Sequence, residues 1–300
     1  MDADTDYRRG LVATAASFLI WGVVPIYWKA IGSISPSEML DWRVLRALPF
    51  AGLCLAVLGG ASQVRATLRR PRLVGILAVS AALVAVNWFI FIEAVADGRV
   101  METSLGYYIN PMVNVLLGFC CLGERPRRLQ WIAIGLAAVG VTVLVVAVGE
   151  LPIMALALAV TFGLYGLVRK LAPVEALPGL FIEVLLVSPL AVLWLVWLAR
   201  EPGMPAWFGA DLATQWLVPL SGAITAIPLV LFAYGARRLP LATVGILQFL
   251  APTGQFLLAT FVYRETFTSA HAATFAFIWT GIALYLLDLR REARRRRRER

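Results

Sequence analysis

The chain is dominated by apolar segments that are each long enough to cross a lipid bilayer. Hydrophobic residues make up 60% of the 300 residues, charged residues make up 15%, and the mean hydropathy is +0.80. A helix needs about 20 apolar residues to cross a hydrocarbon core. The runs are apolar on nearly every face, unlike the alternating strands of a membrane barrel, so we predict an all-α polytopic membrane protein with ten transmembrane helices. The expected segments are 10–29, 38–58, 73–95, 103–121, 129–148, 151–170, 178–198, 214–235, 241–262 and 269–288.

The second half of the chain repeats the first at an offset of 141 residues. Residues related by this offset include Gly22 and Gly163, Lys29 and Lys170, Phe91 and Phe232, Pro111 and Pro252, Glu124 and Glu265, and Gly140 and Gly281. Each unit holds five apolar segments, and an odd number of crossings inserts the second unit in the opposite orientation. Inverted repeats of this kind recur in secondary transporters, whose substrate site lies near the midplane between the halves. We predict two five-helix repeats, at 10–148 and 151–289, followed by a basic tail at 290–300.

The basic residues gather on one side of this predicted arrangement. Of the 27 Lys and Arg residues, 21 lie at the termini and in the connections of one side, and four lie on the other side. Because cytoplasmic loops retain Lys and Arg, we predict that both termini are cytoplasmic and that the protein lies in the cell inner membrane. The net charge of +9 and the arginine run at 294–298 suit anionic lipid headgroups, so we predict no nucleic-acid partner.

The chain lacks the residue groups on which common enzyme mechanisms depend. It contains a single histidine, His271, and no pattern that joins a nucleophile to a base or clusters metal ligands. Cys54, Cys120 and Cys121 lack the spacing of metal or redox sites. No phosphate-binding loop of the Walker type is present. The sequence therefore predicts neither an enzyme nor a bound cofactor or metal, and transport would be passive or driven by a gradient.

Two of the apolar segments carry a matching stripe of polar residues. In the fourth segment Tyr107, Pro111 and Asn114 share one helix face. Each proline removes a backbone hydrogen bond and kinks its helix near mid-span. Buried amides are costly in lipid unless they find partners or face a cavity, so the stripes either line a substrate pathway or join neighbouring helices. The counterparts in the ninth segment, at the offset of 141, are Gln248, Pro252 and Gln255.

Aromatic and ionisable residues inside the segments supply further candidates. Trp21, Trp88, Tyr108 and Tyr165 lie at depths suited to a pocket wall, whereas Tyr27 and Trp28 fit an interfacial aromatic belt better. Charged groups inside a membrane segment are functional hypotheses by default. They comprise Asp41, Arg43, Arg46, Glu93 and Glu183, and Glu183 is a candidate proton carrier or a cap at a helix mouth.

The chain resembles the RarD proteins, which belong to the EamA group of the drug/metabolite transporter superfamily. The resemblance covers nearly the whole chain and is most specific in SLGYYINP (104–111) and FGLYGLVRK (162–170). It implies a ten-helix inner-membrane permease, named for chloramphenicol export, with a pathway between helices 3, 4, 8 and 9 and helices 1 and 6. We therefore predict a substrate pathway formed by Trp21, Asn87, Trp88, Tyr107, Tyr108, Asn110, Pro111, Asn114, Tyr165, Gln248, Pro252 and Gln255.

Two positions depart from the pattern of this family. The family usually reads HRxxW in its second helix and has a tryptophan in its third helix where this chain has Glu93. Here Arg43 keeps the family arginine, and Arg46 replaces the tryptophan of HRxxW. We predict that Arg46 and Glu93 compensate each other as an ion pair. In the alternative, Arg43 takes Glu93 while Arg46 faces water or a substrate carboxylate.

These features predict a secondary transporter that exports small organic metabolites or drugs, including chloramphenicol-like molecules, by alternating access. The expected partners are a small-molecule substrate, the lipid bilayer and protons, and the sequence is compatible with a monomer. An importer or exchanger of amino-acid-like solutes is the alternative within transport. A membrane regulatory protein that transports nothing is the alternative from another class.

Overall fold

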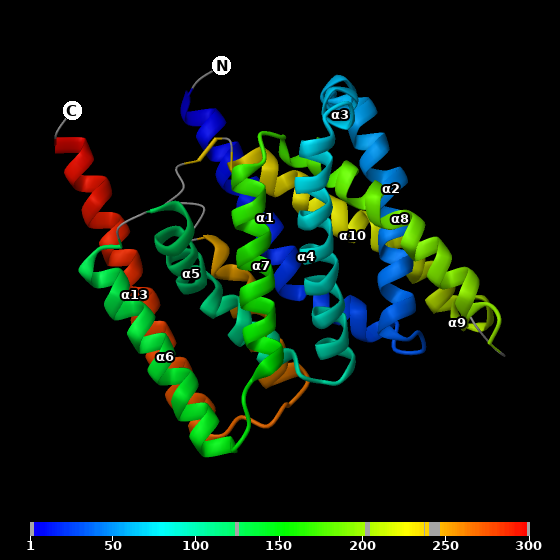
Figure 1. Ribbon diagram of the computed structural model, residues 1–300. Coiled ribbons are helices and arrows are strands. Elements are labelled where there is room, and N and C mark those ends of the chain that lie inside the picture. Colours follow the sequence, from blue (N-terminus) through cyan, green and yellow to red (C-terminus); the bar gives the residue numbers. More distant parts are fainter. Residues whose placement is uncertain (1–2, 124–125, 202–204, 237, 240–246, 299–300) are drawn as a thin grey trace.

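The structure, a computed structural model, describes residues 3–123, 126–201, 205–236, 238–239 and 247–298. These residues form helices and loops, without a β-strand among them. The long helices lie side by side in one bundle, and both termini lie at the same end (Figure 1). We call this end the terminal end and the opposite one the far end.

Ten elements coincide with the ten predicted segments. They are α1 (Ala3–Ala30), α2 (Pro36–Leu58), α4 (Pro71–Ala96), α5 (Val100–Leu122), α6 (Arg128–Val148), α7 (Ile153–Leu171), α8 (Ala176–Leu198), α10 (Leu212–Ala236), α12 (Leu250–Leu257) continued by the π-helix η1 (Leu258–Val262), and α13 (Ser269–Arg298). Two short helices were not predicted, α3 (Ala61–Leu68) and α9 (Ala206–Gly209). The ninth predicted segment begins at 241–246, outside the described residues.

The apolar helices make this an all-α polytopic membrane protein, as predicted. Among the described residues, six helices are long and apolar enough to cross a membrane, or up to eight if two bent pairs each count as one span. One bent pair is α2 with α3, inclined by 119°, and the other is the two halves of α5, inclined by 42°. Ile153–Arg169 and Leu250–Val262 are shorter apolar helices. A count of ten crossings therefore stays a prediction.

Local sequence explains where several helices begin and end. Ser35 precedes α2, and its hydroxyl oxygen accepts a hydrogen bond from the backbone N–H of Glu38 at 3.3 Å, with Pro36 in the first turn. Gly123 and Gly149 end α5 and α6 with φ of 66° and 81°, a left-handed conformation that glycine adopts without steric cost. These are short-range effects, which is why the predicted ends agree closely with the observed ones.

The chain termini differ from the prediction. The sequence predicts a last span that ends near 288 and a separate basic tail at 290–300, but α13 continues without a break to Arg298. Arginine is a good helix former, so the basic residues extend the helix beyond its apolar part. Arg127, at the start of α6, fastens this region through an ion pair with Asp288 at 2.6 Å.

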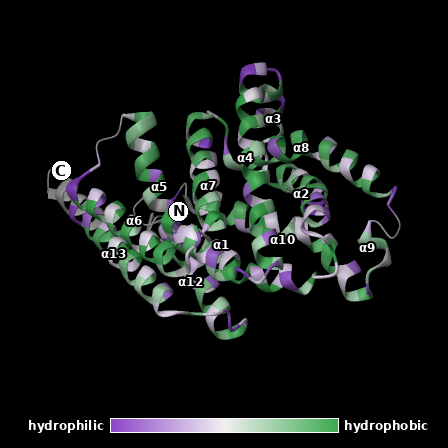
Figure 2. Ribbon diagram, turned by 60° about the horizontal axis from the view of Figure 1, so that its bottom comes forward, coloured by the Kyte–Doolittle hydropathy of each residue, from purple (hydrophilic) through white to green (hydrophobic). Residues whose placement is uncertain are grey.

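The helices pack in a reciprocal pattern. α2 packs against α8, α5 against α12, and α6 against α13. α1 packs against α10 and α12, and α7 packs against α4 and α5. Hydrophobic residues predominate along the helices (Figure 2). Many of them are exposed, including Val57, Val146 and Leu190, which suits contact with lipid. Many polar side chains, by contrast, are buried between the helices.

Candidate functional site

An amide cluster joins α5 and α7 to the residues that directly precede α12. The Asn110 side chain is fully buried, and its Nδ2 donates to the carbonyl oxygen of Ala159 at 3.0 Å. Its Oδ1 accepts hydrogen bonds from Asn114 Nδ2 at 3.1 Å and from Gln248 Nε2 at 3.3 Å. Asn114 remains exposed beyond this contact. The structure thus brings three predicted pathway residues together.

Gln255 lies at another level of the bundle. Its Oε1 accepts from the Thr103 hydroxyl at 2.9 Å, and its Nε2 donates to the backbone carbonyl of Trp21 at 3.2 Å. α5 and α12 are antiparallel, so residues of these two helices that are related by the offset of 141 lie at mirrored depths. Gln255 therefore lies near the start of α5, away from its counterpart Asn114. Both its amide oxygen and its amide nitrogen bond to other helices, which favours the helix-joining role for this residue.

Pro252 and Trp21 belong to the same region. The Pro252 carbonyl oxygen accepts from the Ser104 hydroxyl at 2.8 Å. The Trp21 ring packs on Phe18 and Phe232, with ring centroids 5.5 and 6.0 Å apart, and so belongs to an apolar cluster. The side chain of Pro111 lies outside the described part of the chain, although the bend between the two halves of α5 falls at its position.

The two tyrosines of α5 face opposite sides of the helix. The Tyr107 hydroxyl donates to Asn87 Oδ1 at 3.4 Å, and Asn87 Nδ2 donates to the Leu158 carbonyl and the Thr161 hydroxyl of α7. The Tyr108 hydroxyl oxygen lies 2.7 Å from that of Thr253 in α12. Tyr107 therefore belongs to the α4 and α7 side of the bundle, and Tyr108 to the α12 side.

Arg43 lies in an aromatic environment inside the bundle. Arg43 is 7% exposed. Its guanidinium carbon lies 4.1 Å from the ring centroid of Trp88 and 5.0 Å from that of Trp28. Tyr27 and Tyr107 are close enough to interact with it electrostatically. The prediction of an interfacial belt was wrong for Trp28, which is 6% exposed, and for Tyr27, whose hydroxyl donates to the Leu217 carbonyl at 2.8 Å.

The predicted ion pair between Arg46 and Glu93 is not formed. In the part of the chain that the structure describes, neither Arg46 nor Arg43 pairs with Glu93. The Arg46 guanidinium lies 5.4 Å from the ring centroid of Trp42 and 5.2 Å from that of Trp207. Trp207 comes from α9, an element that the apolar pattern did not predict, so the prediction lacked the group that Arg46 contacts.

Glu38 holds α9 in place. Its carboxylate accepts from the backbone N–H groups of Ala206 at 2.8 Å and Trp207 at 3.0 Å, and from the Trp42 indole N–H at 3.0 Å. Glu38 itself is fully buried. Three donors therefore satisfy this acid, which the sequence analysis did not select.

Glu183 is buried with several polar partners. The Ser80 hydroxyl donates to its Oε1 at 2.6 Å, and the Tyr165 hydroxyl donates to its Oε2 at 3.5 Å. Arg169 Nε lies 3.6 Å from Oε1, so the acid has a cationic partner. Arg169 lies in the FGLYGLVRK stretch, but its charge was used only to assign topology. Ser80 carried no signal that could have singled it out.

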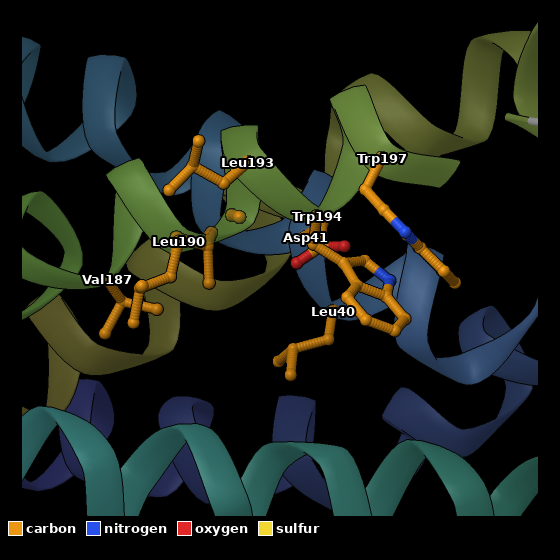
Figure 3. A pocket seen from close by; sticks show the side chains of 9 residues that line it. Leu40, Asp41, Val187, Leu190, Leu193, Trp194 and Trp197 are labelled. Carbon is orange, nitrogen blue, oxygen red and sulfur yellow. The ribbon is translucent and has the colours of Figure 1, made fainter. Parts of the chain in front are cut away.

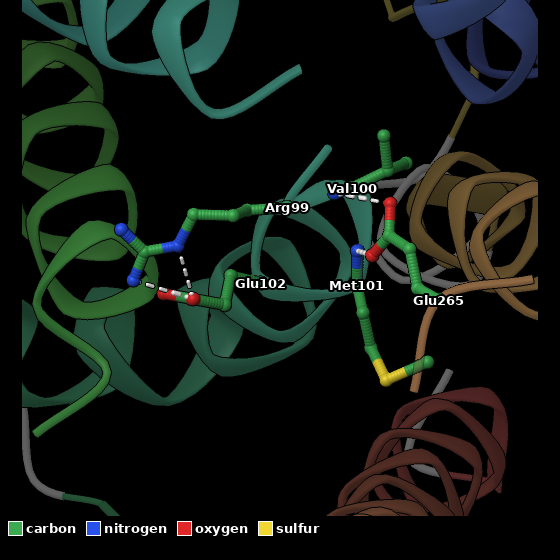
Figure 4. Close-up of polar contacts among 5 residues, drawn as sticks. All are labelled: Arg99, Val100, Met101, Glu102 and Glu265. Carbon is green, nitrogen blue, oxygen red and sulfur yellow. Dashed lines mark hydrogen bonds and ion pairs between the residues drawn. The ribbon is translucent and has the colours of Figure 1, made fainter. Parts of the chain in front are cut away.

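Backbone groups of α5 are bound by an acid at the far end. Glu265 accepts from the backbone N–H groups of Val100 and Met101, both at 2.8 Å, and Arg99 pairs with Glu102 beside this contact (Figure 4). Burial raises the pKa of the Glu265 carboxyl, and the two N–H donors oppose that shift. Glu265 therefore ties the loop after η1 to the start of α5.

A groove of about 560 Å³ lies between α2 and α8. None of the predicted pathway residues lines it. The Asp41 carboxylate lies at the groove beside Trp194, near Trp197 (Figure 3). Leu190, Leu193 and both tryptophans are exposed there, so the groove opens towards lipid rather than into the amide cluster.

The fold and these contacts define a class of protein. Apolar helices surround an interior in which amides, hydroxyls and charged groups bond across helices from both halves of the chain. In membranes such groups are expensive and mark pathways for solutes or ions. This is the organisation of a polytopic membrane transporter.

Comparison with known proteins identifies the family. The model of the EamA-like transporter family matches residues 8–146. Protein RarD of Salmonella typhimurium is 42% identical over 281 residues, covering 94% of this chain and 95% of that protein. An uncharacterized transporter of Pseudomonas aeruginosa is 42% identical over 293 residues, covering 98% of both. One solved structure has the same fold, with a TM-score of 0.64 at 20% identity over 97% of this chain and all of the other. The chain belongs to the RarD group of the EamA-like transporter family, within the drug/metabolite transporter superfamily.

Proposed function

We propose that the protein is a secondary transporter that exports small organic molecules by alternating access between two inverted five-helix repeats. The transporter class follows from the family. The reciprocal packing of the helices is the observation that best supports two equivalent halves. The first helix of each predicted repeat, α1 or α7, packs on the third and fourth helices of the other repeat.

The equivalence of the two halves also appears in close contacts between single residues. A Cβ atom added to Gly140 would lie 3.0 Å from the Thr274 carbonyl oxygen, and one added to Gly281 would lie 2.9 Å from the Ala133 carbonyl oxygen. Gly140 and Gly281 differ by 141 positions, as do Ala133 and Thr274. Small residues allow such close helix approach in membranes. The same contact is therefore made twice, as a pseudo-two-fold axis requires.

Alternating access would open and close the ends of the bundle in turn. At the far end α5 is tied to the second repeat by Glu265, by the bond between Thr103 and Gln255, and by the bond between Ser104 and the Pro252 carbonyl. These contacts hold the start of α5 against the second half of the chain at the far end. An opposite state must break them, while the amide cluster around Asn110 stays near the middle of the pathway.

The substrates we propose are small organic metabolites or drugs, and similarity to the RarD proteins adds chloramphenicol-like molecules. We place the protein in the inner membrane with cytoplasmic termini, as the distribution of Lys and Arg favours. Protons are the proposed coupling ion, with Glu183 as their carrier. An importer of amino-acid-like solutes would use the same architecture in the reverse direction.

The test is flux into everted membrane vesicles, where export from the cytoplasm is measured as uptake. Labelled chloramphenicol and a panel of labelled amino acids are supplied with and without a pH gradient. We expect uptake of at least one compound, and Asn114→Ala should reduce it without lowering protein abundance. Thr142→Ala is the matched control, because Thr142 is exposed on α6 and bonds only within its own helix.

The outcomes separate the alternatives. Uptake confined to right-side-out vesicles would show an importer and refute export. An absence of flux in both orientations, with folded protein present, would refute transport of these compounds and favour a regulatory role.

A further inference from the structure

Arg43 is a buried cation without a counter-ion in the described part of the chain. Its Nε has no hydrogen-bond partner there, and none of the ion pairs of the described residues includes Arg43. An unpaired charge inside a membrane segment costs several kcal/mol. Such a charge is retained where a function requires it.

The acids nearest in sequence do not compensate Arg43. Glu38 is occupied by the Trp42 indole and by two backbone N–H groups of α9. Asp41 lies at the groove between α2 and α8, and Glu93 makes no ion pair with Arg43 in the described structure. No acid of the described chain therefore occupies the guanidinium, which leaves it available to an external anion.

The surroundings of Arg43 suit an organic anion. Trp28 of α1 and Trp88 of α4 place indole rings beside the guanidinium, and Tyr107 of α5 lies close enough to interact with it electrostatically. Rings stack on the faces of a planar guanidinium, whereas its N–H donors point outward in the plane and match a carboxylate bidentately. Aromatic walls also accommodate the apolar part of a small molecule.

The position of Arg43 in the bundle agrees with a pathway site. It lies seven residues after Pro36, or about 10 Å along α2 at 1.5 Å per residue. Tyr107 connects this position to Asn87, which in turn bonds α7 of the second half. The guanidinium is therefore enclosed by helices and linked to polar residues from both halves of the chain.

We propose that Arg43 binds the carboxylate of a transported organic acid, while Trp28, Trp88 and Tyr107 contact the apolar part of that molecule. This inference rests on the proposed function and narrows its substrates to organic anions. Arg46 supplies a contrast, because it also lies between two indoles but contacts Trp207 of α9 and is only half-buried.

The experiment compares carboxylates with their neutral amides. Purified protein is titrated with phenylacetate, 3-phenylpropionate and indole-3-acetate, and with the corresponding amides, and binding is followed by isothermal calorimetry and by thermal unfolding. We expect at least one acid to bind at least tenfold more tightly than its amide, a difference of about 1.4 kcal/mol. Arg43→Gln should abolish the preference, Arg43→Lys should keep part of it, and Arg46→Gln should keep all of it.

Two results would overturn the proposal. One is that no acid in the panel binds better than its amide to the unsubstituted protein, a comparison that needs no variant to fold. The other is that the preference survives in Arg43→Gln. Flux measurements distinguish a failure of this anion-site proposal from a failure of the proposed transport function. Flux of neutral chloramphenicol without any preference for acids would refute the anion site alone, whereas acid binding at Arg43 without flux of any compound would refute transport alone.

Discussion

Replacing Gly281 by alanine tests a close contact between α13 and α6, which belong to different halves of the chain. The added Cβ would lie 2.9 Å from the backbone carbonyl oxygen of Ala133, closer than real Cβ atoms come to other atoms. A backbone atom cannot swing aside as the end of a side chain can. Overpacking of this kind typically costs about 1–3 kcal/mol. In Gly140→Ala, the equivalent change, the Cβ would lie 3.0 Å from the Thr274 carbonyl oxygen.

Gly135, which lies on α6 like Gly140, provides the matched control. Gly135 is exposed on α6, and a Cβ there would have no neighbour within 4 Å. Glycine is about 1 kcal/mol less favourable than alanine inside a helix, so Gly135→Ala should stabilise the protein by about that amount. The same gain applies at Gly281, so the two variants should differ by the overpacking cost of about 1–3 kcal/mol.

The assay is reversible unfolding in mixed micelles of increasing SDS fraction, followed by circular dichroism. We expect Gly281→Ala and Gly140→Ala to unfold at lower SDS fraction than Gly135→Ala. Equal stability of Gly281→Ala and Gly135→Ala would refute the close approach of α6 and α13. A large loss in only one of the two interface variants would refute the equivalence of the two contacts.

Three further predictions follow from the charged groups. Glu183→Gln should abolish flux driven by a pH gradient while folded protein stays in the membrane, and undiminished flux would remove this acid from coupling. Burial raises the pKa of the Glu265 carboxyl, so the state in which it is tied to α5 binds a proton more readily than an open state does. The tied state should therefore be favoured at low pH, and it should lose this contribution as the pH rises through the raised pKa. Spin labels at 98 and 266 should move apart over that pH range. Glu265→Gln should remove this pH dependence. A reporter fused after Arg300 should be active only in the cytoplasm and one in the 200–211 connection only outside; reversed activities would refute the orientation.

The amino-acid sequence alone was enough to predict the class of fold and most helix positions. Bilayer thickness sets the length of an apolar helix, and capping residues such as Ser35 and Gly123 act over a few positions, so both can be recognised locally. The offset of 141 was also readable, because equivalent residues keep their spacing. The specific stretches that resemble RarD proteins identified the family.

Which polar groups meet depends on how the helices pack. The stripes on the fourth and ninth segments were equivalent in sequence, but antiparallel packing places Gln248 beside Asn110 and sends Gln255 to Thr103. Trp28 was expected at the membrane interface and instead lies under Arg43. A helical pattern shows which residues share a face, but not which neighbouring helix that face contacts.

The charged groups show the same division most clearly. Arg46, Glu93 and Glu183 could be recognised as charges inside apolar segments, but their partners could not. Arg46 contacts an indole of α9, and that helix is too short to leave a periodic signal in the sequence. Glu183 binds Ser80, which lies 103 residues earlier in the chain, and Arg169, which lies 14 residues earlier. Partner choice depends on distances in space between segments far apart in sequence, and these are fixed only when the helices pack.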